Sequence, residues 1–348
     1  MVSMERILFR VDVGIHIGLG HLQRCVSLAK ALQRHGIPCL FLTGGDGMIP
    51  TPVEVSGFTA CGIRGVKAGD AADLEQALDM ALRHGCDGVV VDSYDVNADY
   101  LDELRSSGLY VVAIDDLARF PFPCQLVVNG GAHAQQLHYG SSSNDTSFLL
   151  GTRYALLRPE FWEIPFRAVR DSVRTVLVTL GAGDPHDLMP RLLDLLDGLP
   201  DDFAVTAILG PFFKNHAEVQ RTVSACRRPV RLVDAPRSVH DLMLEADLAV
   251  SAGGQTLYEL AATGTPTVAV QVADNQSNHL RALAAEGAVR VAGCAGDAGL
   301  VDSVGKEVLG LMESSDARKK MAAVGRRLVD GRGAVRVAKV LASGGNTR

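Results

Sequence analysis

The chain has 348 residues, a formal net charge of −6 at pH 7, and 47% hydrophobic against 21% charged residues. This length suits two domains, each with its own core, and the hydrophobic share is that of a globular protein. The acidic balance argues against a general nucleic-acid binder, which would carry a strongly basic face. We therefore expect no nucleic-acid partner.

The cysteines and the apolar runs indicate where the protein works. Seven cysteines are scattered without a Cys-x-x-Cys pair, which favours buried thiols over disulfides or a zinc site. The N-terminus leads straight into an apolar strand, so we predict no signal peptide, and no apolar run reaches the roughly 18 residues of a membrane span. We expect a cytoplasmic protein without membrane insertion, whose oligomeric state the sequence does not indicate.

A glycine-rich loop follows the first predicted strand. Residues 7–9 are apolar, and apolar residues from 22 to 32 recur at helical spacing. A strand, a glycine loop and a helix N-terminus together form a place where an anion can bind. The loop is not a dinucleotide fingerprint, because Gln23 stands where the third glycine belongs, and it is not a P-loop, because no Lys-Ser/Thr follows Gly20.

His21 stands at the mouth of this helix, and Arg10 and Asp12 precede the loop at the strand end. A histidine can take a proton from water near neutral pH, and a nearby carboxylate can hold its tautomer. No metal-ligand pattern surrounds these residues. The alternative interpretation is that His21 caps the helix or fills space.

The rest of the first half alternates strands with amphipathic helices. Apolar runs predict strands at 39–42, 88–91 and 111–114, and the spacing predicts a helix over 72–82. Residues 133–150 read as a loop. This alternation predicts a parallel sheet with helices on both faces.

Polar clusters follow the predicted strands. They are Asp92 to Tyr94, Asp115 with Asp116, and Asn129 to Gly131. Because ligands bind off the carboxyl ends of such strands, these clusters should face the same opening as His21. The aspartates have an alternative as turn or helix caps, whereas the phenol of Tyr94 can reach a ligand.

Two arginines follow the predicted loop. Arg153 and Arg158 suit a phosphate or a sugar, with solvated surface side chains as the alternative.

A second strand, glycine turn and helix begin at residue 174 and repeat the organisation of residues 7–35. We therefore predict an N-terminal domain at 1–162, a linker at 163–173, and a C-terminal nucleotide-binding domain at 174–348, whose last helix can pack back toward the first domain. Further strands of the second domain are predicted at 204–209, 230–233, 248–250 and 267–270.

The richest motif of the second half lies after the strand at 248–250. The turn offers backbone N–H groups and two hydroxyls at a helix N-terminus, which suits a diphosphate; its residues are Ser251, Gly253, Gly254, Gln255 and Thr256. Glu259 can accept from ribose hydroxyls or complete a capping box with Thr256. The amides of Asn275 and Gln276 suit sugar hydroxyls and N-acyl groups, with a polar helix cap as the alternative.

These motifs, in this order, resemble the PseG/SpsG family of UDP-sugar hydrolases of pseudaminic acid biosynthesis, which is related to the MurG glycosyltransferase. The match runs over most of the chain. It rests on Arg10 to Asp12, Ile17 to Cys25 with Gly18 and Gly20, Val91 to Tyr94, Ile114 to Ala118, Tyr154 to Phe161, Leu180 to Pro185, Ser251 to Thr256, and Ala273 to Gln276.

The resemblance implies an α/β protein of GT-B type, with two Rossmann-like domains and a cleft between them. It implies hydrolysis of UDP-2,4-diacetamido-2,4,6-trideoxy-β-L-altropyranose, or a close relative, by water attack at the anomeric carbon, with no cofactor and no metal. Carried across, His21 is the base for that water, Asp12 orients or helps it, and Tyr94 lines the sugar site. The UDP-sugar is the implied partner.

The sequence departs from the family at Ala182, at Gln255 and over 129–133, so the exact sugar and the base stay open. One alternative is a MurG-like glycosyltransferase, in which the same loop serves an acceptor hydroxyl. Such an enzyme should show an apolar, basic-rimmed patch, for which 48–53 is the candidate segment, and it lacks adjacent Lys or Arg. A second alternative is a nucleotide-sugar-binding protein without turnover.

Overall fold

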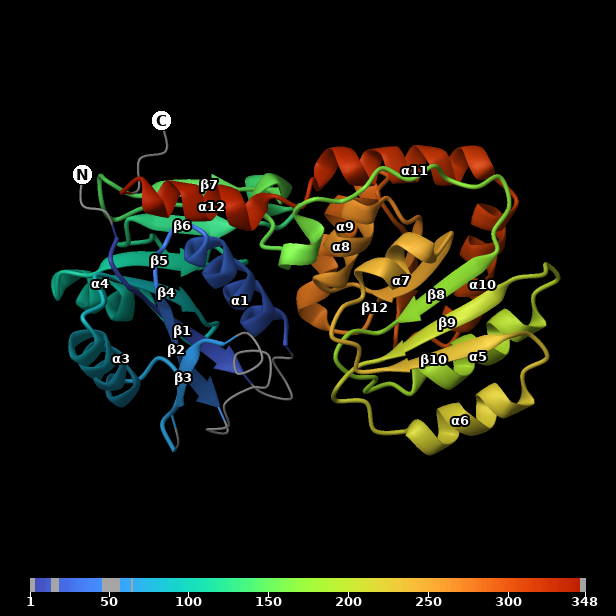
Figure 1. The fold of residues 1–348 in the computed structure, drawn as a ribbon, viewed down its shortest axis with the longest axis horizontal. Coiled ribbons are helices and arrows are strands. Elements are labelled where there is room, and N and C mark those ends of the chain that lie inside the picture. The colour runs from blue at the N-terminus through green and yellow to red at the C-terminus, as the bar shows by residue number, and fades with distance from the viewer. Residues whose placement is uncertain (1–3, 14–18, 46–56, 64, 345–348) are drawn as a thin grey trace. The chain divides into compact units, whose positions relative to one another are not determined.

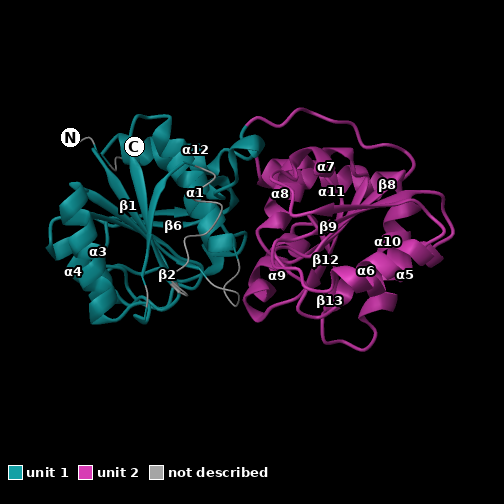
Figure 2. Ribbon diagram, turned by 60° about the horizontal axis from the view of Figure 1, so that its bottom comes forward, with its two compact units in different colours: residues 1–162, 331–348 teal, residues 163–330 magenta. Residues whose placement is uncertain are grey.

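The computed structural model describes residues 4–13, 19–45, 57–63 and 65–344 of the chain. It divides into two compact units (Figures 1 and 2). Unit 1 comprises residues 1–162 and 331–348, and unit 2 comprises residues 163–330.

Unit 1 is built on a parallel sheet in the order β3-β2-β1-β4-β5-β6-β7. Its strands are β1 (Ile7–Val13), β2 (Cys39–Gly45), β3 (Thr59–Gly62), β4 (Gly88–Asp92), β5 (Tyr110–Ile114), β6 (Leu126–Asn129) and β7 (Ser147–Leu150). Its helices are α1 (Gly20–Gln33), α3 (Ala71–His84), α4 (Ala98–Ser106) and α12 (Gly333–Ala342), with 3-10 turns η1 (Ala134–Gln136), η2 (Thr152–Tyr154) and η3 (Pro159–Phe161).

The strands of unit 1 bury both faces. Alternate residues of β1 separate into two cores: Phe9 packs with α1 and α12, whereas Leu8 packs with α3 and α4. Chain order reverses between β1 and β4, which are neighbours in the sheet. In parallel sheets a ligand site lies beyond the carboxyl ends of the strands at such a point.

Unit 2 repeats this plan with the parallel order β10-β9-β8-β11-β12-β13. Its strands are β8 (Thr175–Thr179), β9 (Ala204–Leu209), β10 (Val230–Asp234), β11 (Leu248–Ala252), β12 (Thr267–Gln271) and β13 (Arg290–Cys294). Its helices are α5 (Leu188–Gly198), α6 (His216–Ala225), α7 (His240–Glu245), α8 (Thr256–Thr263), α9 (Ser277–Ala285), α10 (Leu300–Met312) and α11 (Ser315–Leu328), with the 3-10 turn η4 (Asp274–Gln276).

The last helix groups with unit 1. The sequence analysis assigned residues 174–348 to the second domain but allowed its last helix to pack back toward the first. Helix α12 packs on α1, with Val337 and Leu341 fully buried. A Cβ at Gly333 would overlap the backbone of Ala155, so a glycine is needed where α12 meets η2. Residues 163–173, expected as a linker, group with unit 2.

Two short strands depart from the predicted elements of unit 1. The expected loop over 133–150 contains β7, and β3 was not predicted. Each is four residues long and forms an edge of the sheet, so neither has a long apolar run.

Candidate active site

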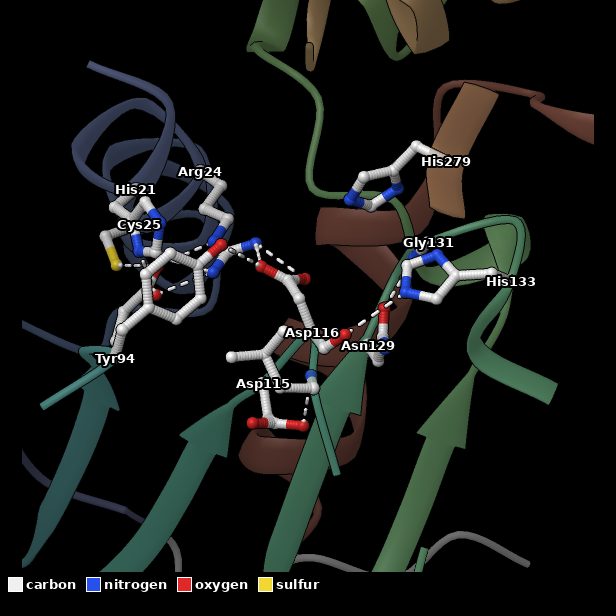
Figure 3. A network of polar contacts seen from close by, with 12 residues as sticks. His21, Arg24, Cys25, Tyr94, Asp115, Asp116, Asn129, Gly131, His133 and His279 are labelled. Carbon is white, nitrogen blue, oxygen red and sulfur yellow. Dashed lines mark hydrogen bonds and ion pairs between the residues drawn. The ribbon is translucent and has the colours of Figure 1, made fainter. Parts of the chain in front are cut away.

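His21 lies in the first turn of α1, next to the carboxyl end of β4 (Figure 3). Its side chain is buried, and its Nδ1 lies 2.6 Å from Oδ1 of Asp92, the last residue of β4. Asp92 is fully buried and pairs in register with Val11 of β1. The histidine and its carboxylate partner therefore meet where chain order reverses in the sheet.

Arg24 joins this pair to a second carboxylate. Its Nε and Nη2 donate to the two oxygens of Asp92 at 2.6 and 2.7 Å. Its Nη1 donates to both oxygens of Asp116, at 2.8 and 3.0 Å. His21 and Arg24 are three residues apart and so share one face of α1. One guanidinium thus holds two carboxylates, and one of these holds His21.

The charges of this cluster explain its protonation states. Burial alone would raise the pKa of the Asp92 carboxyl, but Arg24 and His21 hold that pKa well below its usual range. Burial opposes the charge of Arg24, yet Asp116 and Asp92 raise its pKa well above the usual value. Because Asp92 is an ionised acceptor, it favours the tautomer of His21 that carries its proton on Nδ1 and its lone pair on Nε2.

Tyr94 completes the cluster. Its ring meets the His21 ring edge-on, with centroids 4.6 Å apart and planes at 85°, and its hydroxyl donates to Oδ2 of Asp116 at 3.1 Å. Burial and then Asp116 raise the pKa of this phenol above its ordinary value. Tyr94 therefore stays neutral, with its hydroxyl proton directed to a carboxylate.

Two residues expected at this site have other roles. Arg10 was predicted to bind substrate, but it is fully buried; its Nε and Nη2 each donate to Asp73 at 2.7 Å, and its Nη1 donates to Asp12 at 2.6 Å. Asp12 was expected to orient His21, but no described contact joins the two; Nδ1 of His21 lies 2.6 Å from Asp92, with Nη2 of Arg24 at 3.4 Å. Both corrections follow from β1, which directs Arg10 and Asp12 to the α3 side.

The polar residues that follow β5 have two different roles, and Asn129 at the end of β6 contacts one of them indirectly. Asp115 accepts from the backbone N–H groups of Leu117 and Ala118, so it holds a turn, as the alternative interpretation had it. Asp116 instead points to Arg24 and Tyr94. The Asn129 amide donates to the Tyr139 hydroxyl, which in turn donates to the Asp115 carboxylate.

Other predicted residues of unit 1 have no described contact with this cluster. Gly20 is the first residue of α1, with open space where a Cβ would stand. Arg153 is exposed in η2, and Arg158 lies 3.6 Å from Glu160 and over the Phe161 ring. Gly18 and the segment 48–53 fall outside the described residues.

In unit 2 the predicted phosphate turn joins β11 to α8. Ser251 is fully buried at the end of β11, Gln255 is the N-cap of α8, and Thr256 is its first residue. A Cβ on Gly253 would stand 2.7 Å from Leu280, whereas one on Gly254 would have only Gln276, at 3.9 Å. Gly253 is therefore needed for packing under α9, and Gly254 leaves its side of the turn open.

The remaining predicted residues of unit 2 lie around this turn. Glu259 is buried within α8, and Thr256 is not the N-cap, so these two do not form the capping box. Gln276 accepts from the backbone N–H of Val272 at 2.9 Å, as a turn residue does. Asn275 is exposed in η4.

Sequence reasoning placed Asp92 and Asp116 at the opening that His21 faces, but it gave neither aspartate a catalytic role and gave Arg24 no role. A signal existed for each, because both aspartates follow predicted strands and Arg24 lies one helical turn beyond His21. It was overlooked because Asp12 is closer to His21 along the chain.

Among the described residues, no group of three or more His, Cys, Asp or Glu side chains could hold a metal ion. No helix in this part of the chain is long and apolar enough to cross a membrane.

Comparisons with known proteins point to sugar-nucleotide enzymes. No protein-family model matches the chain. The chain is 29% identical over 206 residues to the spore coat polysaccharide biosynthesis protein SpsG of Bacillus subtilis, covering 57% of this chain and 58% of that protein. It is 22% identical over 286 residues to the UDP-2,4-diacetamido-2,4,6-trideoxy-β-L-altropyranose hydrolase of Campylobacter jejuni, covering 81% of this chain and 97% of that protein.

A Methanocaldococcus jannaschii protein of uncharacterised function is 24% identical over 271 residues, covering 74% of this chain and 54% of that protein. This chain thus spans little more than half the length of this protein and of SpsG.

Solved structures establish the fold. Acinetobacter baumannii MurG superposes with a TM-score of 0.71 at 17% identity, covering 97% of this chain and 99% of that one. The spinosyn rhamnosyltransferase SpnG complexed with thymidine diphosphate gives 0.67 at 16% identity, covering 99% and 100%. The expected fold and resemblance are confirmed: the chain has the GT-B fold and is a homologue of the SpsG and PseG proteins.

Proposed function

We propose that the protein is a UDP-sugar hydrolase that acts on UDP-2,4-diacetamido-2,4,6-trideoxy-β-L-altropyranose or a close relative. The observation that carries this proposal is the buried contact of 2.6 Å between His21 Nδ1 and Asp92. A carboxylate that accepts from Nδ1 leaves the Nε2 lone pair to take a proton from water. In this role His21 activates the water that attacks the anomeric carbon.

The charges of the cluster suit this step. With His21 neutral, Asp92, Asp116 and Arg24 sum to a formal charge of −1, which becomes zero when the imidazole takes a proton. The imidazolium that forms is therefore balanced by carboxylates already in place, so that no buried group must reorient during the reaction.

We assign the nucleotide to unit 2. The turn between β11 and α8 has an open side at Gly254 and leads into a helix N-terminus, an arrangement that stabilises a diphosphate and the negative charge of a departing UDP. Glu259 is the candidate for the ribose hydroxyls. The sugar assignment rests on the hydrolase from Campylobacter jejuni. We propose that the reaction needs no metal. We also propose that it takes place in the cytoplasm and belongs to surface polysaccharide biosynthesis.

The test is release of UDP from the UDP-sugar in the absence of any acceptor, for the wild type and for His21→Ala. We expect the variant to lose about 10²- to 10⁴-fold in turnover, the usual contribution of a general base, while UDP binding by calorimetry stays unchanged. His35→Ala, which removes an exposed histidine of unit 1, is the matched control. A wild type that binds UDP but releases it only when an acceptor is added would identify a glycosyltransferase instead.

A further inference from the structure

The proton of the Tyr94 hydroxyl is already used in a hydrogen bond. It donates to Oδ2 of Asp116 at 3.1 Å, and the ring is held edge-on against His21. A phenol has one proton to donate and oxygen lone pairs to accept with. Once the proton points to Asp116, only the acceptor side of the Tyr94 oxygen is left for a ligand.

Asp116 is built to keep that proton in place. Both of its oxygens accept from Nη1 of Arg24, at 2.8 and 3.0 Å, and its backbone oxygen lies 3.1 Å from Nε2 of His133. The residue is only 7% exposed. Oδ2 of Asp116 thus accepts from the guanidinium and from the Tyr94 hydroxyl, so the phenol is the donor of this pair.

We propose that Asp116 is a positioning residue that fixes the Tyr94 hydroxyl as a donor to itself, so that the phenolic oxygen accepts from an O–H or N–H of the reactants. The donor is either the attacking water or a hydroxyl or amide N–H of the sugar. This inference rests on the proposed function, because it needs a reaction beside His21. It extends that function by fixing the direction of the Tyr94 hydrogen bond: a reactant group beside the phenolic oxygen must be a hydrogen-bond donor and not an acceptor.

The state of the phenol agrees with this. Burial, and then the Asp116 charge, raise the pKa of Tyr94, so it does not act as a phenolate at neutral pH. Arg24 ties Asp116 to Asp92 and hence to His21. The Arg24 guanidinium therefore holds both Asp92, which orients the base His21, and Asp116, which orients the acceptor Tyr94.

The test uses Tyr94→Phe, Asp116→Asn and the double variant. Tyr94→Phe keeps the ring against His21 and removes only the hydroxyl. Asp116→Asn can keep its amide oxygen on Arg24 and turn its NH₂ group to the phenol, which would release the Tyr94 proton toward the ligand. Asp145→Asn is the control, because it removes a carboxylate from another arginine pair of unit 1, with Arg105.

We expect each single variant to lose about tenfold or more in kcat/KM, because each removes a hydrogen bond that the Tyr94 oxygen makes to a reactant. The double variant should lose no more than about the larger single loss, because both changes remove the same acceptor. A fall in kcat with KM unchanged identifies water as the donor. A rise in KM, with weaker binding of the free sugar, identifies a sugar group.

A second readout is independent of turnover. In protein labelled at the tyrosine ¹³Cζ, the Tyr94 signal, assigned by its loss in Tyr94→Phe, should shift in Asp116→Asn and shift again when the UDP-sugar binds. The inference is overturned if folded Tyr94→Phe stays within twofold of Asp145→Asn in both kcat and KM. If the wild type releases no UDP but its Tyr94 signal still moves as described, the hydrolase proposal fails and the acceptor role of Tyr94 stands.

Discussion

Replacing Asp92 by Asn keeps the His21 imidazole but changes the group that sets its orientation and tautomer. Asp92 accepts from His21 Nδ1 and from two nitrogens of Arg24, all within 2.7 Å, and it is fully buried. An Asn amide at this place can donate to Nδ1 and so stabilise the opposite tautomer, with its proton on the Nε2 needed as base. Turnover should therefore fall by about 10²- to 10⁴-fold, the usual contribution of a general base, because the wrong tautomer cannot take the proton from water.

The same change has a stability cost that the structure allows us to bound. Removing one partner of a buried ion pair commonly costs about 3–5 kcal/mol. Arg24 keeps Asp116 in the variant, so we expect about 3 kcal/mol, at the low end of that range. Urea unfolding measures this loss, and calorimetry with UDP reports on unit 2 separately.

The assay for Asp92→Asn is UDP release under saturating UDP-sugar, with Asp145→Asn as the control for an arginine-paired carboxylate of unit 1. Asp92→Glu serves as a second variant if the Asn variant does not fold. A folded Asp92→Asn protein that turns over within threefold of the wild type would refute the orienting role of Asp92 and, with it, our account of His21.

Two further predictions concern stability. Because the pKa of Asp92 is held below its usual range in the folded state, its contribution is present above the unfolded-state pKa of about 3.9 and is lost as the pH falls below that value. The difference in unfolding free energy between wild type and Asp92→Asn should therefore shrink from pH 5 to pH 2 in urea titrations; a constant difference would contradict this. Gly333→Ala should destabilise unit 1 by about 1–3 kcal/mol, because the new Cβ overlaps Ala155. Gly198→Ala, in open space at the end of α5, should be neutral or stabilising in the same thermal melts; equal effects of the two would argue against the docking of α12.

Local patterns predicted most of the fold. The apolar runs at 88–91 and 267–270 form interior strands of their sheets, since strands buried on both faces need continuous apolar sequence. Strands β3 and β7 were not predicted, because edge strands of four residues are too short to show a clear hydrophobic pattern. That α12 packs on the first domain was predicted only as an option, because an amphipathic helix can cover either core and its packing on α1 decides between them.

The site was predictable in outline and not in its pairings. The rule that polar residues gather beyond the carboxyl ends of parallel strands placed Asp92, Tyr94 and Asp116 at the opening that His21 faces. Which carboxylate meets His21 depends on sheet order: β4 lies beside β1, and its last residue reaches α1. Arg10 was misassigned because a charged residue in a strand suggests a ligand, whereas Asp73 of α3, distant in sequence, neutralises it.

The most direct test of the central claim is NMR of the purified protein with UDP-2,4-diacetamido-2,4,6-trideoxy-β-L-altropyranose in oxygen-18 water, with chelator and without an acceptor. We predict release of UDP with the label on the anomeric carbon of the sugar, because water activated by His21 attacks that carbon. Label in the phosphate of UDP, or no release while UDP still binds, would contradict the account.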